Sequence, residues 1–371
     1  MKNATMTARE VQMPLVEGLV GVKDFCRGYL AKQVDWSCSL LPYFQRTRGS
    51  KFMCTYMRTA SLLGSEEFYI VNIPILMWCL APGSITRVLV CLFGITMYVG
   101  NFLKNLLCLP RPSGKYLMDS GDATDRSLDN RDFGWPSVHS LNGVAIPFFA
   151  LRCMFGSVLL WEATDPGNML IGYIIAFAYT GSVCFSRLFL GVHSPADVQG
   201  GMILGGIVLR LWMWAHEGVD AWLTTADPFS VIAWVTAGTL LLLLLHPRVR
   251  PTTYTYEEST CLLGFLGGFL IGGALSRAYD IPLETPDSFL LGAGRMLVGY
   301  AMMFFGREVI KAVTKPVLCT PPQQEKKDDD ALPGVGPFAA GDVTARLLQY
   351  GVGFGTVVSF GAPAAFQALG L

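Results

Sequence analysis

Apolar runs recur along most of this chain, and they limit it to folds that a lipid bilayer can solvate. The stretch from Val231 to Leu245, with its flanks, approaches the ~20 apolar residues that a helix needs to cross the hydrocarbon layer. Leu262 to Leu275 is a second such run. Hydrophobic residues make up 52% of the 371 positions and charged residues only 15%, unlike an ordinary soluble domain. The sequence therefore predicts an all-α, polytopic membrane helix bundle.

The alternation of apolar and polar segments divides the chain into three regions. Residues 1–66 mix basic, aromatic and aliphatic side chains without a spanning run, so we expect amphipathic helices that are interfacial or cytosolic. Residues 67–246 are expected to form a core of six transmembrane helices. Residues 247–371 are expected to add three more, with a flexible loop at 307–342. The nine or so expected spans are 67–82, 85–103, 138–158, 169–186, 196–214, 229–246, 259–276, 289–306 and 343–365.

The distribution of basic residues predicts the orientation of this bundle. With nine spans, the amino terminus and four loops lie on the same side: 104–137, 187–195, 247–257 and 307–342. Most Lys and Arg residues lie in these segments, so the positive-inside rule makes this side cytosolic. A phosphate-binding site would also draw basic residues to its own side.

Several classes of partner are disfavoured by composition. The net charge is zero, which predicts no nucleic-acid partner. The ten cysteines form no CxxC pair, and the acidic run Asp328 to Asp330 lies in a linker, so we expect no metal site and no cofactor. Small-residue spacings predict close helix packing within the chain, with a homodimer face as the alternative; they occur at Gly201 and Gly205, and at Gly264, Gly268 and Gly272.

Ionisable side chains gather in three short segments at the expected ends of spans, all on the same side. The segments are "KNLLCLPRP" with Lys104 and Arg111, "GWPSVHS" with His139, and "SRLFLGVHSPAD" with Arg187, His193 and Asp197. Each cation alone could extend its charged end toward water. Together, three cations near the bilayer boundary favour a clamp for a phosphate dianion.

Two of these segments also contain signals for the start of a helix. Ser194 can cap a helix that has Pro195 in its first turn and Asp197 near its third position. Earlier in the chain, Pro136 opens a second such helix, with outward-pointing backbone N–H groups on Ser137, Val138 and His139. Two helix starts directed at one point provide unpaired donors for an anion.

His193 and Asp197 are four residues apart, a spacing that brings side chains together at a helix start. An aspartate bound to one ring nitrogen leaves the other nitrogen free to attack an electrophile. A structural hydrogen bond is the alternative for this pair. His139 could donate a proton to a leaving oxygen, or it could be a polar residue that reaches the surface.

In order, the three segments read Lys-x6-Arg-Pro, Pro-Ser-x-His and Ser-Arg-x5-His-x3-Asp. Over residues 104–197 this pattern resembles the lipid phosphatase superfamily related to type 2 phosphatidate phosphatases and vanadium haloperoxidases. Within that superfamily, residues 62–215 are similar to the sphingosine-1-phosphate phosphatases, through "LGSEEFYIVNIPILMWCLAP", "MYVGNFLKNLLCLPRP" and "FGWPSVHSLNGVAIP". Val138 replaces the glycine that the superfamily often has, and members of this subfamily commonly carry a larger residue at that position.

The resemblance implies a role for each of these residues. The six-helix region becomes the phosphatase core, with His193 as the nucleophile that forms a phosphohistidine. Asp197 then orients His193, and His139 is the general acid and base. The phosphate-binding residues would be Lys104, Arg111, Ser137, Val138 and Arg187, with Ser186 as a weaker candidate.

The resemblance also implies a substrate and a location. The substrate would be sphingosine 1-phosphate or a related long-chain base 1-phosphate, hydrolysed without a metal in the endoplasmic reticulum membrane. Some relatives are taken to face the lumen, whereas the basic residues here favour the cytosolic face, so both faces stay open at this point. A broader lipid phosphatase acting on phosphatidate or polyprenyl diphosphate is one alternative. A lipid transporter or scramblase is another, although its charged residues would be expected along a path rather than at one end of the spans.

Overall fold

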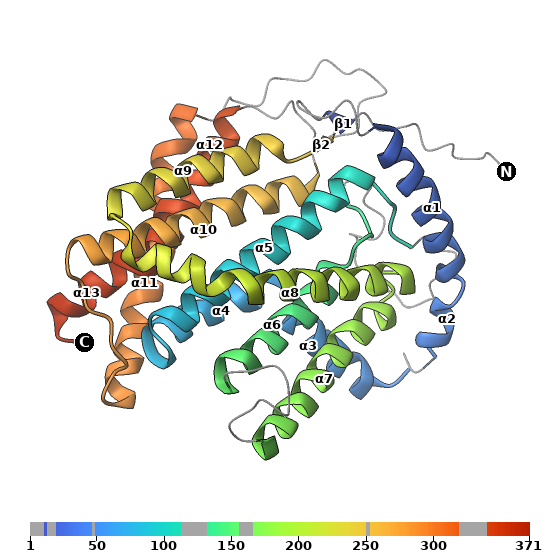
Figure 1. Ribbon diagram of the computed structural model, residues 1–371, viewed down its shortest axis with the longest axis horizontal. Coiled ribbons are helices and arrows are strands. Elements are labelled where there is room, and N and C mark those ends of the chain that lie inside the picture. The colour runs from blue at the N-terminus through green and yellow to red at the C-terminus, as the bar shows by residue number, and fades with distance from the viewer. Residues whose placement is uncertain are drawn as a thin grey trace.

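The computed structural model describes residues 11–12, 20–46, 49–112, 132–155, 166–249, 253–318 and 340–371, and nearly all of them are helical (Figure 1). Two short strands, β1 and β2, pair antiparallel. The elements are β1 (Val11–Gln12), α1 (Val20–Cys38), α2 (Leu41–Phe44), α3 (Lys51–Leu63), α4 (Glu66–Ile75), the π-helical segment η2 (Leu76–Leu80), α5 (Ser84–Leu107), α6 (Val138–Phe155), α7 (Pro166–Phe189), α8 (Pro195–Thr225), α9 (Pro228–Leu245), β2 (Arg248–Val249), α10 (Tyr254–Ala278), α11 (Phe289–Leu318), α12 (Ala340–Tyr350), the π-helical segment η6 (Gly351–Gly361) and α13 (Ala362–Leu369).

Eight helices of the described part are long and apolar enough to cross a membrane. They are α5 to α11 and the composite helix Gly341–Leu369. The expected all-α membrane bundle is therefore confirmed. The eight described helices are one fewer than the nine or so spans expected. The span expected at 67–82 is the missing one, because α4 and η2 hold only ten and five residues. At about 1.5 Å per residue these two segments are shorter than the hydrocarbon layer.

Several helices extend beyond the predicted ends. α8 continues to Thr225 rather than stopping at 214, and α11 continues to Leu318 rather than 306. The start of the expected flexible loop at 307–342 is therefore helical, and its last residues open α12. The rest of that loop, 319–339, lies outside the described residues, as does 113–131 of the loop at 104–137.

Glycines at helical spacing allow close packing inside the chain, as predicted. A Cβ at Gly205 would lie 2.7 Å from the carbonyl oxygen of Leu141 on α6, so α8 and α6 approach at this position. On α10, Gly264 faces the backbone of Leu347, and Gly268 faces that of Gly351. Within the described residues, these stripes hold α6 against α8, and α10 against the carboxy-terminal helix.

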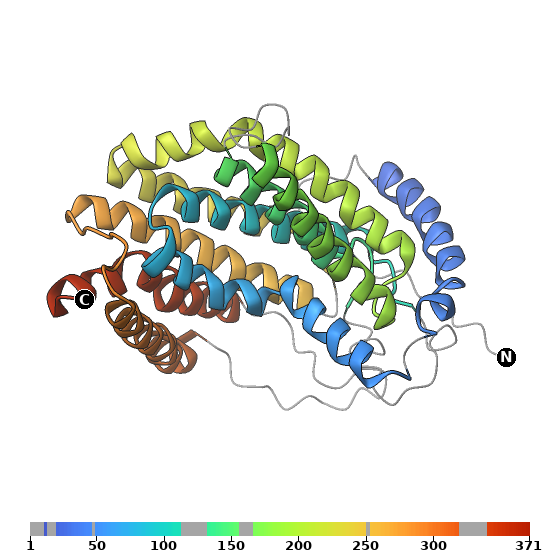
Figure 2. The same ribbon diagram turned by 90° about the horizontal axis from the view of Figure 1, so that it is seen from below.

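One end of the bundle collects the three motif segments. α5 ends there and α8 begins there, while the carboxy terminus lies at the opposite end (Figures 1 and 2). α1 lies across this end and presents Phe25, Tyr29 and Trp36 as exposed aromatic side chains. α3 packs along α7, where the Tyr56 hydroxyl lies 2.7 Å from that of Ser182. The amino-terminal region thus contributes α3 to the wall of the bundle.

Candidate active site

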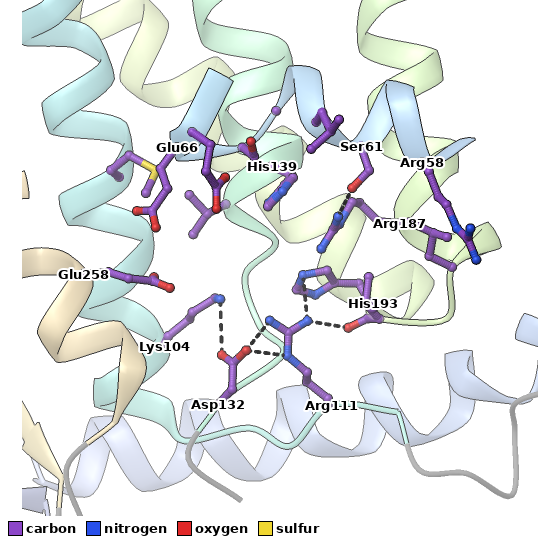
Figure 3. A pocket seen from close by; sticks show the side chains of 18 of the residues that line it. Arg58, Ser61, Glu66, Lys104, Arg111, Asp132, His139, Arg187, His193 and Glu258 are labelled. Carbon is purple, nitrogen blue, oxygen red and sulfur yellow. Dashed lines mark hydrogen bonds and ion pairs between the residues drawn. The ribbon is translucent and has the colours of Figure 1, made fainter. Parts of the chain in front are cut away.

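A cavity of about 670 Å³ opens at the end of the bundle where the motif segments meet (Figure 3). Its wall includes six of the eight predicted site residues: Lys104 from α5, Arg111 from the loop after it, Val138 and His139 from α6, Arg187 from the last turn of α7, and His193 from the loop before α8. The long-range expectation from the sequence, that these segments converge, agrees with the structure.

His193 is almost completely buried, and its two ring nitrogens face different groups. Nη1 of Arg111 lies 3.2 Å from Nε2. Because a guanidinium can only donate hydrogen bonds, Nε2 must offer its lone pair. Burial lowers the pKa of His193 well below its ordinary value, and the nearby charges of Arg111 and Arg187 lower it further. The ring is therefore neutral at pH 7, with its proton on Nδ1, which lies 3.6 Å from Oδ2 of Asp197.

Asp197 is held by the start of α8. Its Oδ2 accepts a 2.7 Å hydrogen bond from the backbone N–H of Ser194, and its own N–H donates to the Ser194 hydroxyl at 3.2 Å. This reciprocal pair is a capping box with Pro195 in the first turn, as the sequence predicted. The cap fixes the carboxylate beside Nδ1 of His193, although Asp197 itself does not line the cavity.

Two serines predicted near the phosphate are engaged elsewhere. The N–H of Ser137 does not point outward, because it donates to the backbone carbonyl of Asp197 at 3.0 Å. The Ser137 hydroxyl accepts from the Ser140 hydroxyl at 3.0 Å and so belongs to the start of α6. Ser186 donates to the carbonyl of Val183 at 2.6 Å. Both predicted serines are fully buried and lie outside the cavity wall.

Asp132, which sequence reasoning missed, lies between two of the predicted phosphate-binding cations. It accepts from Nε and Nη2 of Arg111 at 2.9 and 2.5 Å, and lies 3.7 Å from Nζ of Lys104. Burial alone would raise the pKa of Asp132, but Lys104 and Arg111 together hold it below its ordinary value. A backbone bridge between Pro110 and Phe133 places this carboxylate beside Arg111.

α3 adds residues to the cavity that the sequence did not point to. The Ser61 hydroxyl accepts a hydrogen bond from Arg187, and Arg58 also lines the wall. Gly64, after the end of α3, lies against His139, because a Cβ there would be 3.2 Å from the His139 Cβ. The break between α3 and α4 thus allows both helices to approach the histidine.

The polar groups of the cavity are balanced in charge. Four basic and four acidic residues line it together with His139 and His193. Among the residues that the structure describes, no group of three or more His, Cys, Asp or Glu side chains is arranged to hold a metal ion. The arrangement offers one nucleophilic nitrogen, a second histidine and several cations around a space large enough for a phosphoryl group.

Part of the chain matches a known protein family. Residues 85–220, from the start of α5 to near the end of α8, match the model of the PAP2 superfamily. Residues 85–220 therefore form a PAP2 domain. All eight predicted site residues lie inside the matched PAP2 region, whereas Arg58, Ser61, Glu66 and Glu258 of the cavity wall lie outside it.

Similar proteins include several phosphatases. The lipid phosphate phosphatase delta of Arabidopsis thaliana is 27% identical over 79% of this chain and 70% of its own length. A dihydrosphingosine 1-phosphate phosphatase of Saccharomyces cerevisiae is 26% identical over 76% of this chain and 69% of its own. The human sphingosine-1-phosphate phosphatase 2 is 25% identical over 85% of this chain and 79% of its own length. No solved structure matches significantly. This PAP2 protein is therefore a membrane-spanning phosphatase, and the transporter alternative loses its support.

Replacing Asp132 by asparagine tests whether this carboxylate offsets the charge of Lys104 and Arg111 in the anion-free cavity. Asp132→Asn should lower the free energy of unfolding by about 1–3 kcal/mol, because two buried cations lose a charged partner. Orthovanadate, a phosphate analogue, should then raise the melting temperature more than in the wild type, since it supplies the missing negative charge. Thermal unfolding in detergent, with and without vanadate, measures both effects.

Asp220→Asn is the matched control, because Asp220 pairs with Arg87 at 2.6 Å near the other end of the bundle. This variant should melt earlier but gain as much from vanadate as the wild type. Equal vanadate-induced increases in all three proteins would contradict the assignment of Asp132 to the anion site.

Proposed function

We propose that this protein is a lipid phosphate phosphatase that hydrolyses long-chain base 1-phosphates, such as sphingosine 1-phosphate, through a phosphohistidine. The observation that carries the proposal is the environment of Nε2 of His193. It is a buried, neutral imidazole nitrogen whose lone pair points to Arg111 among the cations of the cavity. A nucleophile beside preorganised positive charge is what phosphoryl transfer requires.

In the first step, Nε2 of His193 attacks phosphorus, and the ester P–O bond breaks as the N–P bond forms. His139 gives a proton to the departing lipid oxygen. Asp197, held beside Nδ1 by its cap, stabilises the positive charge that the ring acquires. Lys104 and Arg187 bind the phosphoryl oxygens.

Arg111 and the start of α6 complete the anion site in this proposal. Arg111 turns its hydrogen bond from Nε2 to the phosphoryl group. The N–H of Val138 lies in the first turn of α6, where it has no acceptor within the helix. Ser137 acts indirectly, by positioning other residues. Its hydroxyl accepts a hydrogen bond from the Ser140 hydroxyl, and its N–H donates to the backbone carbonyl of Asp197.

In the second step, water attacks the phosphorus of the phosphohistidine. His139, which has lost its proton, accepts one from this water, and the N–P bond breaks. Inorganic phosphate leaves, and His193 returns to its neutral form. Both protons are accounted for by His139, so the cycle regenerates the starting site.

The choice of substrate rests on two supports. The names of the yeast and human relatives give dihydrosphingosine 1-phosphate and sphingosine 1-phosphate as their substrates. The cavity lies at the ends of membrane-spanning helices, where a phosphate head group can bind while its chain stays in the bilayer.

The test is phosphate release by detergent-purified protein, without added magnesium and in EDTA. Sphingosine 1-phosphate should be hydrolysed faster than phosphatidate. His193→Ala should reduce turnover by at least about 1000-fold, as loss of a nucleophile does. His216→Ala is the control, because His216 lies on α8 beyond the cavity and contacts the carbonyls of Trp212 and Met213. Hydrolysis of phosphatidate or a polyprenyl diphosphate instead would overturn the substrate.

We further propose that the protein lies in the endoplasmic reticulum membrane with this cavity facing the cytosol. The first part rests on the family resemblance and the second on the basic residues of the cavity side. In sealed endoplasmic reticulum vesicles, activity toward added sphingosine 1-phosphate should then be the same before and after opening with detergent. Activity that appears only after opening would place the site in the lumen.

A further inference from the structure

Three acidic side chains of the cavity, those of Glu66, Glu67 and Glu258, have no role in the chemistry described above. Glu66 from the start of α4 and Glu258 from the start of α10 both line it. Figure 3 shows them pointing into the cavity on the side of Lys104, with Arg187 and His193 on the other side. A pocket for a phosphate dianion alone is expected to be positive rather than balanced. The cavity instead has acidic side chains beside its cations, with Glu66 and Glu258 on the side of Lys104.

Asn101 provides an independent sign of a ligand at this position. Its side chain is completely buried and lines the cavity, yet neither Oδ1 nor Nδ2 has a hydrogen-bond partner among the described residues. Buried amides are normally paired, since an unpaired one costs free energy. One turn away, Asn105 is paired through both atoms, with Pro247 at 3.2 Å and Thr253 at 2.9 Å. Within the described part of the chain, Asn142 has one unpaired amide atom away from the cavity, whereas Asn101 lines the cavity with both of its atoms unpaired.

The face of α5 that lines the cavity changes in character along the helix. Lys104, Asn101 and Met97 follow one another at spacings of three and four residues, so they share this face. The order is charged, then polar, then apolar, with steps of about 5 Å. An amphiphile has the same order, from its phosphate through its polar carbons to its chain.

A second cavity of about 250 Å³ continues from this point. It shares Glu66 and Glu258 with the first cavity, so these carboxylates lie where the two meet. Its wall includes apolar side chains of α4, α5, α10 and η6, namely Ile70, Phe93, Leu262, Phe265 and Phe354. The polar part of this wall is formed by Tyr254, Glu257, Arg346 and Tyr350. The apolar side chains can contact the first part of a hydrocarbon chain whose head group lies in the first cavity.

From this arrangement we propose that Glu66, Glu258 and Asn101 form a subsite for the amino-alcohol part of a sphingoid 1-phosphate. The two carboxylates bind the ammonium group on the carbon next to the phosphate-bearing carbon, and the amide of Asn101 binds the neighbouring hydroxyl. The inference rests on the proposed function, because it takes the phosphate to lie at Lys104 and His193. The subsite predicts selection against phosphatidate, which has no ammonium group to bind the carboxylates.

Two substrates separate this subsite from the phosphate site: sphingosine 1-phosphate and hexadecyl phosphate, a long-chain monoester without an amine. The double variant Glu66→Gln/Glu258→Gln should lose roughly 10- to 100-fold in kcat/KM for sphingosine 1-phosphate, as expected for lost hydrogen bonds to a charged group. Its kcat/KM for hexadecyl phosphate should be unchanged or higher. Glu217→Gln, which removes an exposed charge that pairs with Arg152, should leave both values unchanged.

Asn101→Leu supplies a second readout. Because no hydrogen bond within the described residues is lost, this variant should melt at or above the wild-type temperature while its kcat/KM for sphingosine 1-phosphate falls. Asn105→Leu, which breaks two hydrogen bonds, should melt earlier. An Asn101→Leu variant that is equally stable or more stable, with unchanged kinetics on both substrates, would remove Asn101 from the subsite.

Binding of sphingosine, which has the ammonium but no phosphate, tests the subsite without catalysis. The double variant should bind it at least about 10-fold more weakly than the wild type. Equal losses on both phosphate substrates would show that the carboxylates only position Lys104, and unchanged sphingosine affinity would also overturn the subsite. If the wild type hydrolysed neither phosphate, the proposed function would fail, and the sphingosine measurement would still decide the subsite.

Discussion

Lys104, Arg111 and Arg187 are held close together at one end of a membrane bundle. Because little of their side-chain surface is exposed, their mutual repulsion has to be offset by nearby groups. Asp132 offsets two of these charges in the anion-free protein, and the Ser61 hydroxyl accepts from the third. A phosphoryl group can take the place of such partners because it brings its own negative charge. Burial and the same charges lower the pKa of His193, so in the proposed mechanism a single arrangement prepares both the binding of phosphate and the nucleophile.

The backbone makes this arrangement possible through two helix starts that are bonded to each other. The capping box of α8 fixes Asp197 beside His193, and the carbonyl of Asp197 receives the N–H of Ser137 at the start of α6. Close packing at Gly201 and Gly205 holds the two helices together behind this junction. His139 and His193 thereby enter the same cavity from different helices. The PAP2 region supplies these groups, whereas α3, α4 and α10 supply the wall that we assign to the rest of the lipid.

The sequence predicts the parts of the site whose signals are local. The Ser194-Pro195 helix start and the position of Asp197 in it follow from capping rules, and the convergence of the motif segments follows from counting spans. Asp132 could not be selected in this way, because it is one of five aspartates in the loop at 104–137, the others being Asp119, Asp122, Asp125 and Asp129. Only the backbone bridge between Pro110 and Phe133 distinguishes it. Glu258 and Arg58 reach the cavity through tertiary packing, which the spacing of residues in the sequence does not reveal.

Asn101 did have a local signal, since it is a polar residue one turn from Lys104 within an apolar helix. The longer ends of α8 and α11 were missed because charged residues continue those helices past the apolar run.

The central claim is that His193 carries the phosphoryl group during turnover, and trapping that group measures it most directly. Protein turning over sphingosine 1-phosphate with a labelled phosphate would be denatured rapidly in alkali, in which phosphohistidine is stable, and digested for mass spectrometry. Labelled phosphate is expected on Nε2 of His193 and none on His139. Label on His139 would contradict a phosphohistidine at His193. So would an active sample, quenched rapidly during turnover, that carries no phosphate on any histidine.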